Sequence, residues 1–107
     1  MMYIKEIEEL EKVLNAEKAV LYKHSPVCGV SAAVKKEVDL FVLDHSDVPV
    51  YVIDVRAQRP LSRETADRLE IRHESPQAIV IINARPVWHA SHFDINADSL
   101  AAAVTGR

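Results

Sequence analysis

Hydrophobic residues change their spacing several times along the first half of the chain, and each change predicts a new element. Apolar residues recur every three or four positions from Ile4 to Leu14, which predicts an amphipathic helix. The run from Ala19 to Lys23 predicts a strand, and the β-branched run from Val50 to Val55 predicts a second strand covered on both faces. Between them, one helical stripe begins near Cys28 and ends at residues 44–47; its members are Val30, Val34, Val38, Phe41 and Val42.

The second half predicts a third helix, a hairpin and a last helix. Ser62 is the predicted N-cap of the third helix, which has Ala66 and Leu69 on its apolar face and Ile71 near its end. Residues 78–82 form an apolar strand, residues 83–85 a tight turn, and residues 86–92 the return strand of the hairpin. Asn96 caps the last helix, whose inner face carries Leu100 and Val104.

This order, α-β-α-β-α-β-β-α, predicts one α/β domain over residues 1–107. The strand–helix–strand start favours a parallel pair with a right-handed crossover, and the hairpin adds antiparallel strands. We therefore expect a four-stranded mixed sheet with helices on both faces. A cysteine after the first strand and a proline just before the hairpin, in this order of elements, are typical of a thioredoxin-like fold.

Composition and charge narrow the possible functions. The 107 residues are 49% hydrophobic and 27% charged, which is ordinary for a globular domain. A net charge of −3 argues against a general nucleic-acid binder. No apolar run reaches the roughly 20 residues that span a bilayer, and no signal peptide is visible at the N-terminus. With a single cysteine as well, we expect a cytoplasmic monomer without membrane or nucleic-acid partners.

Cys28 is the candidate nucleophile, because it stands where the second helix is predicted to start. Backbone N–H groups and the helix dipole stabilise a thiolate there, whereas a buried structural cysteine is the alternative. Gly29 follows it without bulk, and Ser31 occupies the place of the second cysteine of a redox pair. The Ser31 hydroxyl either solvates the thiolate or simply bonds to the backbone. Because oxygen forms no disulfide, an external thiol must release any adduct on Cys28.

Four short motifs stand out along the chain: Lys23-His24-Ser25 before Cys28 and Ser31, Arg59-Pro60, His73-Glu74-Ser75-Pro76-Gln77 and Trp88-His89-Ala90-Ser91-His92. Together they resemble the monothiol bacilliredoxins of the bacillithiol system, and the similarity runs over nearly the whole chain. One departure is Gly29, where members of that family often carry proline. The resulting Cys28-Gly29-Val30-Ser31 is similar to the CGFS signature of monothiol glutaredoxins, some of which carry iron–sulfur clusters.

The resemblance implies roles for particular residues. Cys28 would be the nucleophile, Pro76 would be cis beside it, and the Ser75 backbone would pair with a substrate segment. Bacillithiol carries a malate group with two carboxylates, so basic side chains near the site would bind it. The candidates, which are otherwise ordinary solvated surface residues, are Lys23, His24, Arg59, Arg72 and His73.

A metal site is not predicted. His89 and His92 are three residues apart on a predicted strand and would point to opposite faces, and Trp88 is expected to pack on the hairpin. The implied activity is removal of bacillithiol from bacillithiolated proteins, with bacillithiol as co-substrate and no cofactor. Two alternatives remain open: a CGFS-type carrier of a [2Fe–2S] cluster, and a non-catalytic interaction module whose cysteine senses oxidation.

Overall fold

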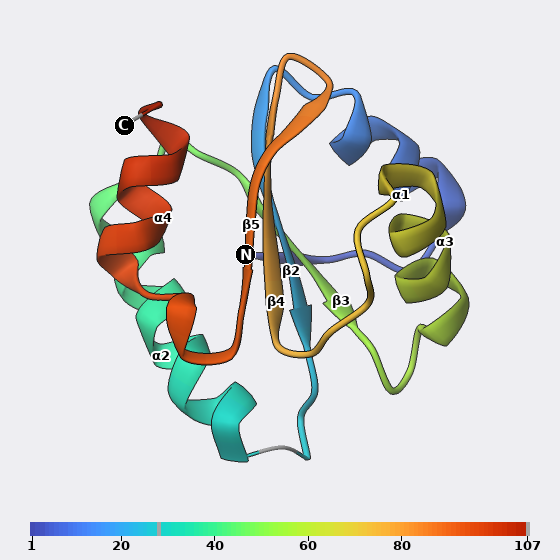
Figure 1. Ribbon diagram of the computed structural model, residues 1–107, viewed down its shortest axis with the longest axis horizontal. Helices are drawn as coiled ribbons and strands as arrows, with labels where there is room; N and C mark the ends of the chain where they lie inside the picture. Colours follow the sequence, from blue (N-terminus) through green and yellow to red (C-terminus); the bar gives the residue numbers. More distant parts are fainter. Residues whose placement is uncertain (28, 107) are drawn as a thin grey trace.

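A mixed β-sheet forms the centre of the molecule (Figure 1). The structure is a computed structural model that describes residues 1–27 and 29–106. Within these residues the sheet has five strands in the order β1-β3-β2-β4-β5. The strands are β1 (Met2–Tyr3), β2 (Lys18–His24), β3 (Val50–Asp54), β4 (Gln77–Ile82) and β5 (Arg85–Ser91). β1, β3 and β2 are parallel, and β4 and β5 are antiparallel to their neighbours, as predicted for a mixed sheet.

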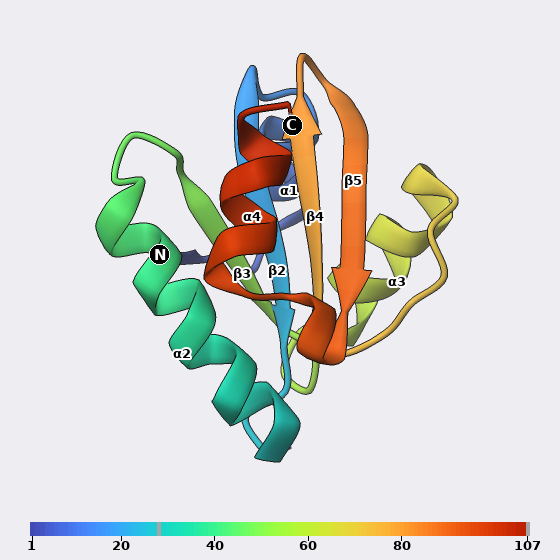
Figure 2. The same ribbon diagram turned by 60° about the vertical axis from the view of Figure 1, so that its left-hand side comes forward.

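Helices cover both faces of this sheet, also as predicted (Figures 1 and 2). The helices are α1 (Ile7–Leu14), α2 (Gly29–Asp44), α3 (Arg59–Leu69) and α4 (Ala97–Val104), with a short 3₁₀ turn η1 (His92–Asp94) before the last one. α1 and α3 lie on one face, and α2 and α4 lie on the other. None of the helices within the described residues is long and apolar enough to cross a membrane.

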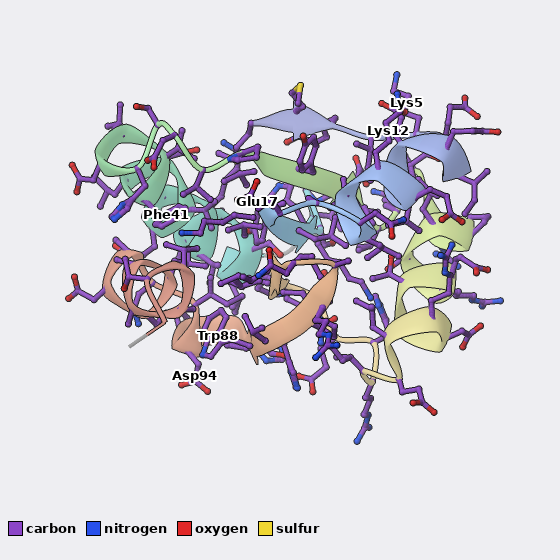
Figure 3. The ribbon with its side chains drawn as sticks, turned by 90° about the horizontal axis from the view of Figure 1, so that it is seen from above. Lys5, Lys12, Glu17, Phe41, Trp88 and Asp94 are labelled. Carbon is purple, nitrogen blue, oxygen red and sulfur yellow. The ribbon has the colours of Figure 1, made fainter. Side chains whose placement is uncertain are left out.

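The two faces hold separate hydrophobic clusters, and β2 contributes to both. Successive side chains of a strand point to opposite faces, so Val20 and Tyr22 join the cluster under α2 and α4, while Ala19 and Leu21 join the cluster under α1 and α3. Phe41 of α2 is fully buried in the first cluster. Trp88 of β5 packs against the same cluster, which confirms the predicted packing role (Figure 3).

Two predicted starts were wrong. The first helix begins at Ile7, after a capping box between Glu6 and Glu9. Ile4 lies before it, where its N–H donates to the Val52 carbonyl at 2.9 Å and continues the edge formed by β1. β1 is the strand that the four-stranded prediction lacked, because two exposed residues are too few to show an alternation of apolar and polar positions.

The third helix begins at Arg59, three residues before its predicted N-cap. Pro60 lies in the first turn, where its missing N–H costs no intrahelical bond. Ser62 is therefore inside the helix and is buried, rather than capping it. The position of Ser62 matters for the site described below.

Two other predictions of local structure are confirmed. Asn83 and Ala84 have φ values of 51° and 64°, so they form the tight turn between β4 and β5. The Asn96 side chain accepts a 2.8 Å hydrogen bond from the Ser99 N–H and caps α4.

Candidate functional site

The segment that carries Cys28 lies between the end of β2 at His24 and the start of α2 at Gly29. Cys28 itself is outside the described residues, so its role as nucleophile stays a prediction from the sequence. Gly29 is exposed, and a Cβ built on it would meet no heavy atom within 4 Å. Its predicted part in stabilising the thiolate is therefore a matter of backbone position rather than of packing.

Ser31 is fully buried in the first turn of α2 and fastens the segment before Cys28. Its Oγ accepts a hydrogen bond of 3.3 Å from the Ser25 N–H, which confirms that the hydroxyl bonds to the backbone. Its carbonyl accepts a 3.4 Å hydrogen bond from the Tyr22 hydroxyl. Because Oγ acts as acceptor toward Ser25, its own proton can still be donated to another acceptor. A second role in solvating the thiolate is compatible with this arrangement.

A hollow of about 390 Å³ borders the same segment. Ser25 and Val27 contribute from the chain just before Cys28, and the remaining lining residues come from the turn after β3, from α3 and from the loop before β4. These lining residues are Val55, Arg56, Arg59, Ser62, Arg63 and His73. The hollow therefore borders residues that come shortly before the predicted nucleophile in the sequence, and it is rich in cationic side chains.

Local sequence explains how the arginines reach this hollow. The Asp54 carboxylate accepts hydrogen bonds from the N–H groups of Arg56 and Ala57, at 3.0 and 3.1 Å, and shapes the turn after β3. Arg59 and Arg63 then lie four residues apart on α3, which places them on one face of the helix. An arginine guanidinium presents a planar fork of donors suited to carboxylates. The sequence prediction included Arg59 but missed Arg56 and Arg63.

A hydrogen-bond network connects the wall of the hollow to a buried lysine behind it. Lys23 of β2 is fully buried, and its Nζ donates to the Ser62 carbonyl at 3.1 Å. The same Nζ is 3.1 Å from Nδ1 of His73, and the Ser62 Oγ is also 3.1 Å from that ring nitrogen. Lys23 is thus not a solvated surface residue. Three elements meet at this network: β2, α3 and the loop before β4.

Burial and charge lower the pKa values of the two basic groups in this network. Burial lowers the pKa of Lys23 to about 8. Burial also lowers the pKa of His73, and the nearby positive charges of Lys23 and Arg63 lower it further, against an opposing effect of Glu74. His73 is therefore a neutral ring near pH 7.

The remaining basic candidates lie away from the hollow. His24 is on the opposite face of the sheet, where its Nδ1 is 3.3 Å from the Tyr22 hydroxyl. Burial, followed by the charge of Lys35, lowers the pKa of His24. Arg72 is exposed, and its carbonyl accepts a 2.9 Å hydrogen bond from Nε2 of Gln77. Arg59 and His73 thus both line the hollow, and Lys23 is buried behind His73, whereas His24 and Arg72 do not take part.

The Ser75–Pro76 peptide bond is cis, as the resemblance implied. The Pro76 carbonyl accepts a 3.0 Å hydrogen bond from the His92 N–H, which ties this loop to the end of β5. The Ser75 hydroxyl is buried and has no hydrogen-bond partner among the described residues. The predicted contact of Pro76 with Cys28, and the pairing of Ser75 with a substrate, both involve atoms beyond these residues and stay predictions.

The prediction that His89 and His92 point to opposite faces of one strand was wrong, because His92 lies outside β5. β5 ends at Ser91, and His92 has a φ of 55° at the start of η1, so the alternation of the strand stops before it. Both histidines border one shallow hollow together with Glu74 and Asp94. In residues 1–27 and 29–106, no group of three or more His, Asp or Glu side chains could hold a metal ion.

Solved structures define the fold class. The chain aligns with a structure described as a proposed oxidoreductase with a thioredoxin fold, at 33% identity and a TM-score of 0.89, over 95% of this chain and 91% of the other. Mitochondrial thioredoxin 3 from Saccharomyces cerevisiae aligns at 13% identity and a TM-score of 0.78, over 100% and 95% of the two chains. Fasciola hepatica thioredoxin aligns at 18% identity and a TM-score of 0.76, over 99% of this chain and 98% of the other. The protein has a thioredoxin-like fold.

The family follows from the sequence match. The family model described as "Monothiol bacilliredoxin BrxC" matches residues 2–100, and the chain belongs to this family. Fold and family together assign it to thiol redox chemistry. A curated relative, the nitrogen assimilation regulatory protein nac of Escherichia coli, is 43% identical over 49 residues, which are 44% of this chain and 16% of that protein. A match to a sixth of the relative's length carries no functional argument.

Proposed function

We propose that the protein removes bacillithiol from mixed disulfides on other proteins. In the first step, the Cys28 thiolate attacks the bacillithiol sulfur of the mixed disulfide. A disulfide forms between Cys28 and bacillithiol, and the target cysteine leaves as a thiolate. In the second step, the thiolate of another bacillithiol attacks the bacillithiol sulfur of that adduct. Cys28 leaves as a thiolate, and bacillithiol disulfide is released.

The arginine-lined hollow is the observation that carries this proposal. It is bordered by Ser25 and Val27, directly before Cys28 in the sequence, and by Arg56, Arg59 and Arg63. Bacillithiol's malate group has two carboxylates, and arginine forks bind carboxylates with charge-assisted hydrogen bonds. A hollow of about 390 Å³ has the size of a small-molecule site. In this arrangement the malate group occupies the hollow while the bacillithiol sulfur faces Cys28.

The rest of the proposal follows from this chemistry. Thiol–disulfide exchange by Cys28 needs no resident cofactor, so bacillithiol is the co-substrate and bacillithiolated proteins are the partners. Ser75, beside the cis bond, is proposed to pair with the backbone of the target protein. A single cysteine fits a reducing compartment, and we place the protein in the cytoplasm as a monomer.

A mutational comparison tests the hollow. We expect Arg59→Gln and Arg63→Gln each to lower the rate of de-bacillithiolation about tenfold or more, since a hydrogen bond to a charged group is worth about 1.5–3 kcal/mol. Arg85→Gln is the matched control. It removes the same charge, but Arg85 lies at the turn end of the hairpin. Equal effects of all three substitutions would contradict the assignment of the hollow.

A visible iron–sulfur chromophore with no exchange activity would favour the cluster carrier instead.

A further inference from the structure

We infer that Lys23 is a positioning residue that holds His73 as the neutral tautomer protonated on Nε2, so that the ring donates a hydrogen bond into the arginine-lined hollow. An ammonium group has three donors and no acceptor. Because Nζ of Lys23 is 3.1 Å from Nδ1 of His73, that nitrogen must be the acceptor. A neutral ring that accepts at Nδ1 carries its proton on Nε2.

The surrounding groups support the same tautomer. The Ser62 hydroxyl, also 3.1 Å from Nδ1, can donate to the same nitrogen. Lys23 has little freedom to move away, because it is fully buried and also donates to the Ser62 carbonyl. His73 itself is exposed and lines the hollow. The ring is thus fixed from the buried side and presents its other nitrogen to the ligand space.

Burial and nearby charge together decide whether the ring can become a cation. Burial disfavours the imidazolium most, the charges of Lys23 on β2 and Arg63 on α3 disfavour it further, and Glu74 beside the ring favours it. Protonation at Nδ1 would also place an N–H against the Lys23 ammonium and the Ser62 hydroxyl. His73 therefore stays a neutral donor across neutral pH, and the arginines supply the positive charge that a carboxylate needs.

This arrangement predicts a carboxylate site whose affinity changes little between pH 6 and 7. If His73 titrated freely, carboxylate binding would strengthen as pH fell through about 6.5. With the ring held neutral, binding follows the arginines, which do not titrate in this range, while Lys23, whose pKa is about 8, stays largely protonated. The inference deepens the proposed function, on which the identity of the ligand rests, but the state of the His73 ring can be measured without any exchange activity.

Nuclear magnetic resonance of the full chain tests the tautomer directly. Long-range proton–nitrogen correlations of His73 at pH 7 should show a proton on Nε2 and none on Nδ1. Ser62→Ala should keep this pattern, because the lysine donor remains. Lys23→Met, which keeps an unbranched side chain one atom shorter and removes the charge, should raise the pKa of His73 part of the way toward its ordinary value, because burial of the ring remains. A ring protonated on Nδ1 in the wild type would overturn the inference, including in the case that Lys23→Met does not fold.

Binding of malate, measured by calorimetry between pH 6 and 7, gives the second test. We expect a flatter profile for the wild type than for Lys23→Met, which should bind up to about threefold more tightly at pH 6 than at pH 7 because His73 then titrates. Adding His73→Gln to Lys23→Met should restore the flat profile, since an amide N–H is a neutral donor. A flat profile in Lys23→Met itself would contradict the positioning role. Loss of de-bacillithiolation with these results intact would instead count against the proposed substrate.

Discussion

Lys23 shows how one position in a strand can differ from its neighbours. It follows four apolar or aromatic residues of β2. Its side chain points toward α3, whereas the side chains of Tyr22 and His24 point to the face covered by α2. Alternation along a strand predicts these opposite faces. The sequence does not show that the Lys23 ammonium is buried, because the residues that receive it, Ser62 and His73, are 39 and 50 positions away.

Burial of the charged Lys23 side chain should lower the free energy of unfolding. Its pKa is lowered to about 8, so the unfolded chain binds more protons than the folded chain between pH 8 and about 10.4. The wild type should therefore gain stability as pH rises through this window. At pH 7 we expect Lys23→Met to be more stable by about 1–2 kcal/mol after allowance for solvent screening, with a difference that shrinks toward pH 10. Urea unfolding at several pH values measures this; a less stable Lys23→Met variant at pH 7 would contradict it.

Cys28 should have a thiol pKa below the free value of about 8.5. It directly precedes α2 in the sequence. α2 has 16 residues, and the unpaired N–H groups of its first turn form the positive end of the helix dipole. The cationic hollow beside Val27 adds to the same effect. The rate of alkylation by iodoacetamide against pH reports the thiolate fraction. A midpoint at or above about 8.5 would mean that the thiol is not activated.

At the scale of elements, the starts of α2 and α3 together define the site. α2 begins next to Cys28 and is fastened through Ser31, and α3 begins at Arg59 and carries the hollow's arginines. The sequence predicted the first start but placed the second at Ser62. The signal that it missed is Pro60, which favours the first turn of a helix. Arg63 was missed because charged residues on a helix usually form a solvated face.

The first turn of α2 can be tested by restoring a second cysteine. Ser31→Cys should give a dithiol site, because residues three apart at a helix start lie on one face. The new thiolate should then attack the Cys28 sulfur of the bacillithiol adduct, forming an internal disulfide and releasing bacillithiol as a thiol. Mass spectrometry distinguishes this product from a persistent adduct. If the oxidised variant with bacillithiol shows only the adduct, the two side chains do not face each other.

The cap of α4 gives a test of the fold that is independent of the site. Asn96→Ala removes the acceptor for the Ser99 N–H and should cost about 1 kcal/mol of unfolding free energy. Asp98→Ala, an exposed change in the first turn of the same helix, is the control and should cost less. Equal small effects in urea unfolding would mean that the cap is not formed in solution.

At the scale of the whole molecule, hydrophobic periodicity and turn residues predicted the layers and four of the five strands, but not the edge strand β1. Apolar runs gave β2, β3 and β4, the Asn83–Ala84 turn gave the hairpin, and Asn96 gave the start of the last helix. The site was less predictable, since it depends on which side chains from distant elements meet. The sequence suggested that several basic residues surround the site. Because successive side chains of β2 point to opposite faces, Lys23 lies beside His73 near the hollow that Arg59 lines, and His24 lies on the other face.

The central claim is that Cys28 takes bacillithiol from a protein and passes it to a second bacillithiol. The most direct measurement follows a purified bacillithiolated protein by intact mass spectrometry after mixing with the full chain, first without and then with free bacillithiol. The account predicts loss of one bacillithiol mass from the target, its appearance on this chain but not on Cys28→Ser, and its release as bacillithiol disulfide when free bacillithiol is added. A target that keeps its bacillithiol in the presence of the folded, reduced wild type would contradict the account.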